Sequence, residues 1–205
     1  MPIRTIDLNM TSNQEETGSL NVAMKHASQL LEADPGLAVE QLQAILEAIP
    51  DHGPALLLLA IARRRLDQPR AALDILESLI EVEKNVSGAY FELGLTQAAL
   101  GRGDQAVLAL RRAVALNPKH PLAWRYLADH LMAIGDTQAG DEAYAKHIHC
   151  STQNPRLQRA AAAMVKNDMA TAERLLKIHL FETPTDVPAI RMLGEVAVRC
   201  GQNDD

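Results

Sequence analysis

The feature that most constrains this chain is a repeat with a period of about 34 residues. Prolines close successive units at Pro50, Pro118 and Pro184, with Lys84 and Thr152 in the equivalent places. Aligned on these residues, the units begin near positions 19, 53, 87, 121, 153 and 187, in equal steps except for the fourth, which is shorter by two. Such a period is typical of proteins that stack one small supersecondary unit, whose neighbours bury the core together.

Each unit predicts a helix, a turn and a second helix. In the unit from residue 87, apolar residues over 90–97 recur at spacings of three and four, which places them on one helix face. Gly101 and Gly103 then interrupt the pattern, and a second apolar stripe follows over 106–116. Pro118 ends it, because proline disfavours α geometry in the residue that precedes it.

Composition supports the same architecture. The chain is 47% hydrophobic but only 3% aromatic, so its apolar residues are mostly small aliphatic ones that suit close helix packing. Gly94 and Ala106 stand where the two helices of a pair should cross, and a larger side chain there would force the axes apart. We therefore expect an all-α protein with a flexible tail over residues 1–15 and stacked helix pairs over 16–205. The expected units are 19–52, 53–86, 87–120, 121–152 and 153–186, followed by a half unit at 187–201.

The order of a large residue, Leu, a small residue, then Ala, a bulky residue, Ala and Pro resembles the tetratricopeptide repeat (TPR). This resemblance implies a right-handed superhelix, an α-solenoid of about five helix-turn-helix units plus an extra C-terminal helix. Segments such as AYFELGLTQAALGRGDQAVLALRRAVALNP are also similar to the N-terminal repeat region of bacterial TPR-containing sulfotransferase proteins.

In the TPR family the first helix of each pair lines a concave groove, and the resemblance implies the corresponding positions in this chain. The candidate groove residues are Leu57, Ile61, Arg64, Phe91, Leu95, Arg125, Asp129, Met132, Arg191 and Glu195. The apolar members would contact a partner and the charged members would orient it. Met132 and Met164 suit an adaptable binding surface and an irregular core equally well, so both interpretations stay open. The Lys and Asn of the family's carboxylate clamp are absent, which disfavours an adaptor for chaperone tails.

Three hypotheses about function follow. The first is a protein-protein interaction module that binds a peptide or a partner domain in the groove and does no catalysis. The second is the non-catalytic repeat region of a sulfotransferase whose domain for 3′-phosphoadenylyl sulfate is missing, which agrees with a chain that stops in the middle of its sixth unit. The third is a homodimer through the C-terminal helix, although that helix could instead cap the array.

Other classes of function are disfavoured. A formal charge of −6 argues against a nucleic-acid partner, and no apolar run is long enough for a signal peptide or a membrane span. No cofactor is expected, because glycine-rich phosphate loops and the common catalytic motifs are absent. His147, His149 and Cys150 are the nearest candidates for metal ligands, but His147 falls at a place that packs inside a helix pair. Cys150 and Cys200 predict free thiols, and we expect a cytoplasmic protein.

Overall fold

The computed structural model describes residues 8–201 and, from Ser19 onward, their side chains. Over these residues the chain forms eleven α-helices and no strand. The helices are α1 (Leu8–Ala33), α2 (Pro35–Ala48), α3 (Gly53–Arg65), α4 (Pro69–Val82), α5 (Ser87–Ala99), α6 (Gly103–Leu116), α7 (Pro121–Ala133), α8 (Thr137–Ser151), α9 (Pro155–Val165), α10 (Met169–Glu182) and α11 (Val187–Gly201). None of them combines the length and the apolarity needed to cross a bilayer.

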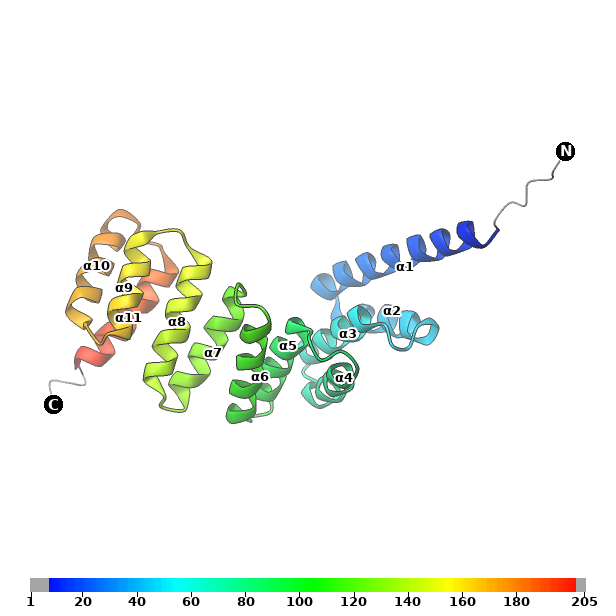
Figure 1. The fold of residues 1–205 in the computed structure, drawn as a ribbon, viewed down its shortest axis with the longest axis horizontal. Helices are drawn as coiled ribbons and strands as arrows, with labels where there is room; N and C mark the ends of the chain where they lie inside the picture. The colour runs from blue at the N-terminus through cyan, green and yellow to red at the C-terminus, as the bar shows by residue number, and fades with distance from the viewer. Residues whose placement is uncertain (1–7, 202–205) are drawn as a thin grey trace. The chain divides into compact units, whose positions relative to one another are not determined.

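The helices belong to two compact units, the first with α1 to α5 and the second with α6 to α11. Within each unit, every helix packs against the next one along the chain (Figure 1). Odd-numbered helices also contact each other, α1 with α3, α3 with α5, and α9 with α11. This succession of packed helix pairs confirms the predicted all-α, solenoid-type architecture.

Four tight turns join the first and second helices of successive pairs, and each contains one residue with positive φ. These residues are Asp67 (φ 56), Gly101 (φ 74), Gly135 (φ 86) and Asn167 (φ 57). Glycine reaches this left-handed region without a steric penalty, and Asp and Asn tolerate it better than other residues do. Each of the four turns therefore has a residue type that tolerates positive φ, although only two of them have glycine there.

Small residues fill the tightest positions of the core. Ala38, Ala72 and Ala106 are fully buried in second helices, and Ala60 and Ala128 are only 1% exposed in first helices. Because these side chains end at Cβ, the paired helices can approach closely. The large buried residues Leu42, Leu76, Leu110 and Leu176 fill the remaining space.

Two boundaries differ from the sequence-based expectation. Helix α1 begins at Leu8, so part of the predicted tail is helical, while residues 1–7 lie outside the described residues. Helix α9 begins at Pro155, two residues after the expected start of that unit, because the Asn154 side chain caps it. The two-residue shortening of the period falls in α9, which has 11 residues whereas α7 has 13.

Candidate functional site

Five of the candidate groove residues lie in the first unit, on α3 and α5. Leu57, Ile61 and Leu95 are partly exposed, and Phe91 is only 9% exposed. Leu57 packs over the start of α5, where its Cδ2 lies 3.2 Å from the place of a Cβ on Gly88. These apolar side chains thus present their edges, and not their full surface, to a partner.

Arg64 is engaged inside the first unit. Its Nε donates to Glu92 Oε2 at 2.9 Å, and its Nη2 lies 2.8 Å from the same oxygen. The neighbouring Arg65 donates to the carbonyl of Leu31 and to Glu32, both at 2.8 Å. This basic run therefore ties α3 to α1 and α5, and it also places positive charge at the C-terminal end of α3, where the helix dipole favours it.

Of the other five candidates, all in the second unit, four line one pocket, namely Asp129, Met132, Arg191 and Glu195. The pocket is partly open, and about 370 Å³ not filled by atoms lies in it when open solvent is included. Its lining residues are Ala128, Asp129, Met132, Asp141, Tyr144, Met164, Arg191, Met192 and Glu195. The fifth candidate, Arg125, is not a lining residue, and its Nε lies 4.0 Å from Asp129 Oδ2.

Helical periodicity explains why these residues meet. Asp129 and Met132 are three residues apart on α7, and Arg191, Met192 and Glu195 fall within one turn of α11, so each set shares a helix face. The pocket is therefore formed mainly by α7, α9 and α11, which are the first helices of their pairs. The second helix α8 adds Asp141 and Tyr144, which the sequence analysis did not single out.

The charges at the rim are paired with each other. Arg191 donates to Asp129, and its guanidinium lies 5.6 Å from the centre of the Tyr144 ring. Arg125 makes no hydrogen bond to Asp129 through its Nε, and its guanidinium lies 5.5 Å from the centre of the Tyr126 ring. Burial raises the pKa of Tyr144, so its hydroxyl stays protonated at neutral pH. The rim thus presents a nearly neutral, preorganised polar edge around an apolar floor.

A buried ion pair fixes the back wall of the pocket. Arg199 Nη1 and Nη2 donate to the two oxygens of Asp141 at 2.6 and 2.7 Å, and Arg199 Nε donates to Glu195 at 2.8 Å. The side chain of Asp141 is 5% exposed and that of Arg199 16%. The hydrogen bond to Asp141 is the main cause that raises the pKa of Arg199. The pair joins α8 to α11 with a bidentate geometry that is among the strongest in proteins.

The repeat alignment contains a signal that could have found this pair. Asp141 occupies the place of Val39, Leu73 and Val107 in the preceding units, all of which are buried. A carboxylate at a core position must have a partner, because an unpaired buried charge is strongly unfavourable. The buried position of Asp141 therefore predicts a positively charged side chain on a neighbouring helix.

The candidate metal ligands of α8 were His147, His149 and Cys150, and the contacts of His147 are those of a residue packed inside the protein. His147 is buried, and its Nδ1 lies 2.9 Å from the Pro121 carbonyl and 3.0 Å from Ser151 Oγ. Burial lowers the pKa of His147, so the ring is neutral at pH 7. Among the described residues, no three His, Cys, Asp or Glu side chains converge as metal ligands would. Cys150 and Cys200 are not disulfide-bonded.

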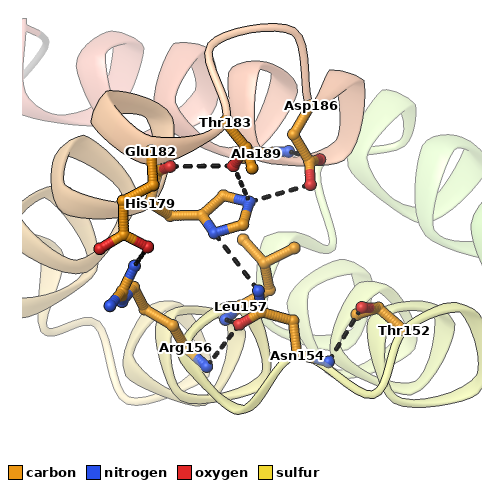
Figure 2. Close-up of polar contacts among 9 residues, drawn as sticks. All are labelled: Thr152, Asn154, Arg156, Leu157, His179, Glu182, Thr183, Asp186 and Ala189. Atoms are coloured by element: carbon orange, nitrogen blue, oxygen red, sulfur yellow. Dashed lines mark hydrogen bonds and ion pairs between the residues drawn. The ribbon is translucent and has the colours of Figure 1, made fainter.

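A second polar cluster, which sequence reasoning missed, surrounds the buried His179 (Figure 2). His179 Nε2 lies 2.9 Å from both Asp186 Oδ2 and Thr183 Oγ1, and its Nδ1 lies 3.4 Å from Asn154 Nδ2. With the proton on Nε2, every group has a partner, because the Asn154 amide donates to Nδ1 and the Thr183 hydroxyl donates to the His179 carbonyl at 2.9 Å. Asp and Thr share one ring nitrogen, whereas a nucleophilic relay needs them on opposite nitrogens.

This cluster instead joins three helix ends. Asn154 caps α9 by accepting from the Arg156 and Leu157 backbone N–H groups, and Asp186 Oδ1 accepts from the Ala189 backbone N–H at the start of α11. Burial alone would raise the pKa of Asp186, but hydrogen bonds from His179 and Ala189 outweigh it and hold the pKa below its usual value. The cluster sets how α9, α10 and α11 meet, and so positions the α11 side of the pocket.

Comparisons with known proteins agree with the fold. A family model described as tetratricopeptide repeat matches residues 57–114 and 91–155. A tetratricopeptide repeat protein from Parabacteroides merdae superposes with a TM-score of 0.67 at 16% identity, over 91% of this chain and 75% of the other. MamA 41-end from Desulfovibrio magneticus RS-1 gives 0.63 at 18% identity, over 82% and 97%. A chain of the structure of Naa15/Naa10 bound to HypK-THB gives 0.63 at 15% identity, over 89% and 29%.

At these identities the likeness concerns the fold alone. No curated protein matches the sequence. The similarity to the repeat region of sulfotransferase proteins rests on the sequence pattern and stays a prediction.

Proposed function

Since this chain carries tetratricopeptide repeats, we propose that it is a protein-interaction module and that its second unit binds a partner peptide or domain at the pocket between α7 and α11. The observation that carries the proposal is the convergence of four candidate groove residues, from two helices far apart in the sequence, around one pocket. A structural neighbour determined with bound protein partners supports this class of function.

The lining of the pocket indicates what it would hold. Met132, Met164 and Met192 line it, and thioether side chains adapt to the shape of an apolar anchor. A partner would therefore insert one aliphatic or aromatic side chain, while its backbone follows the rim.

The paired rim charges would contribute orientation more than affinity. Asp129 already holds Arg191, and Asp141 already holds Arg199, so a partner gains little from a new charge pair that must displace an existing one. Binding energy in such an interface comes mainly from a few buried anchors. The proposed mechanism is recognition without the making or breaking of bonds.

Methionine methyl NMR tests the location of binding. A random peptide library displayed on phage is selected against the full chain, and the enriched peptide is titrated into protein labelled at the methionine methyl groups. We expect the resonances of Met132, Met164 and Met192 to shift, while Met24, in the first unit, does not. Shifts confined to methionines away from the pocket, or a library that enriches no peptide, would contradict the proposal.

A variant of the pocket lining tests the energetics. Met132→Ala removes a partly exposed thioether side chain from the lining, so the fold should persist and affinity for the enriched peptide should fall about tenfold, the effect of a moderate hot spot. Lys177→Ala is the matched control, because this exposed side chain of α10 does not line the pocket. Equal affinities for both variants, measured by fluorescence anisotropy, would place the peptide elsewhere.

A further inference from the structure

Of the three methionines that line the pocket, Met132 is the most exposed. It is partly exposed, whereas Met164 and Met192 are 4% and 1% exposed. The pocket is itself partly open, so a small solute can reach Met132 without a movement of the protein. A thioether that solutes reach is the kind of methionine that oxidants modify.

The sulfur of Met132 lies beside a charged donor. Arg199 Nη2 donates to Met132 Sδ at 3.8 Å and to Asp141 Oδ1 at 2.7 Å. The other nitrogens of this guanidinium donate to Asp141 Oδ2 and to Glu195. A thioether sulfur is only a weak acceptor, so one N–H of a mostly buried cation has a poor partner. An oxygen bonded to the sulfur would give this N–H a much better one.

Gly140 gives the thioether its place against α8. A Cβ on Gly140 would lie 2.9 Å from both Sδ and Cε of Met132, closer than real Cβ atoms come. The equivalent positions of other second helices hold alanines that are fully buried, namely Ala38, Ala72, Ala106 and Ala172. The thioether thus packs in space that a Cβ takes in the other helix pairs, and this packing keeps the sulfur next to Arg199.

We propose that Met132 is a site of oxidation by hydrogen peroxide, and that Arg199 holds the oxygen of the resulting sulfoxide. A lone pair of the thioether sulfur attacks one peroxide oxygen, and the O–O bond breaks. The new hydroxyl group on sulfur gives its proton to the departing hydroxide, so the products are methionine sulfoxide and water. Sulfur is oxidised by two electrons, and peroxide is reduced.

The sulfoxide would change the pocket while the fold persists. Oxidation turns a flexible apolar side chain into a polar one, and the pocket loses one of its three thioethers. The new oxygen accepts from Arg199, so no polar group is left buried without a partner. Peroxide would therefore weaken the binding of an apolar anchor. This consequence rests on the proposed function, whereas the site of oxidation does not.

Peptide mapping by mass spectrometry tests the site. Trypsin places Met132, Met164, Met169 and Met192 on four separate peptides. In the folded full chain, Met132 should gain oxygen at least about tenfold faster than the other three, which are 1–8% exposed and react only when the structure opens. In urea all four should react at about the same rate. A Met132 that reacts no faster than the buried methionines in the folded chain overturns the proposal.

The stereochemistry of the sulfoxide tests the role of Arg199. Methionine sulfoxide has two epimers, and separate reductases act on each, so the two are measured by digestion with each enzyme. An oxygen held by Arg199 should give mainly one epimer at Met132, whereas the chain oxidised in urea should give both about equally. The double variant with Asp141→Val and Arg199→Leu leaves no member of the buried pair unpaired and should lose the preference. A preference that persists without Arg199, or equal epimers in the unchanged folded chain, refutes this role.

Peptide affinity tests the consequence. Peroxide treatment of the unchanged chain should lower its affinity for the enriched peptide about tenfold, as the loss of the same thioether does in Met132→Ala, and both reductases with dithiothreitol should restore it. Met132→Leu, which has no sulfur at this place, should bind equally before and after peroxide. Met24→Leu, in the first unit, is the matched control and should lose affinity like the unchanged chain.

The outcomes separate this inference from the proposed function. An oxidised chain that binds the peptide as tightly as the untreated chain overturns the regulation and leaves the proposed function standing. An untreated chain that binds no peptide refutes the proposed function, and the peptide map still decides whether Met132 is the oxidation site.

Discussion

The pair formed by Asp141 and Arg199 allows a quantitative test of the second unit. Asp141→Val restores the residue type that the preceding repeats carry at this place, but it leaves the guanidinium of Arg199 inside the protein without its main acceptor. Removing one member of a buried pair costs about 3–5 kcal/mol. Because Arg199 is 16% exposed and keeps Glu195 as a partner, we expect a loss near the lower limit, about 3 kcal/mol.

Urea unfolding measures this loss. With a slope of about 2 kcal/mol/M, the midpoint should fall by about 1.5 M. Trp124 is the only tryptophan of the chain and lies on α7, so its fluorescence reports the unfolding of the second unit. The double variant with Asp141→Val and Arg199→Leu should recover most of the lost stability, since two apolar side chains can replace a buried pair at little cost. A single variant that loses less than about 1 kcal/mol would show that water, and not protein, surrounds the pair, and would refute the reasoning.

Three further predictions concern the turns, the buried histidine and the pocket. Asp67→Gly and Asn167→Gly should each raise the free energy of unfolding by about 0.5–1 kcal/mol in urea titrations, because glycine adopts positive φ without strain. His147 has its pKa lowered by burial, so the folded chain should lose stability as the pH falls below about 6.5, where the unfolded state binds the proton first. His147→Leu should flatten this dependence of the melting temperature on pH. Gly140→Ala places a Cβ 2.9 Å from Met132 Sδ and Cε, so the thioether should turn into the pocket, shift its methyl resonance and weaken peptide binding while the fold persists.

The fold was largely predictable because the same sequence pattern recurs in each unit. A nearly constant period, small residues at the helix crossings and turn-forming residues such as Gly101 all point to helix pairs, and the eleven helices of the described residues confirm them. The unit expected from near residue 153 has its first helix, α9, from Pro155, whereas the alignment used the residue at the end of the preceding unit, Thr152. The physical boundary is the Asn154 cap, whose side chain accepts from the first backbone N–H groups of the helix.

The pocket was predictable only in part. Asp129, Met132, Arg191 and Glu195 followed from the rule that first helices line the groove, and the structure brings them together. Asp141 and Tyr144 come from a second helix, which that rule ignores. The partner of Asp141 lies 58 residues away, on α11. Periodicity within one helix contains no information about such a contact, so only the misplaced charge at a core position could have indicated it.

The internal pairing of the charges bears on how a partner is recognised. Arg199 is locked by Asp141 and Glu195, and Arg191 is held by Asp129 against the ring of Tyr144. Such preorganised groups need no rearrangement when a partner binds, but because they are already paired, they form only weak new ion pairs with it. Affinity at the pocket should therefore depend on the apolar anchor and change little between low and moderate salt, whereas an interface built on free charges would weaken steeply. A steep salt dependence of peptide binding would mean that the partner breaks the pair between Arg191 and Asp129. The side chains at the rim would then rearrange on binding instead of keeping their positions.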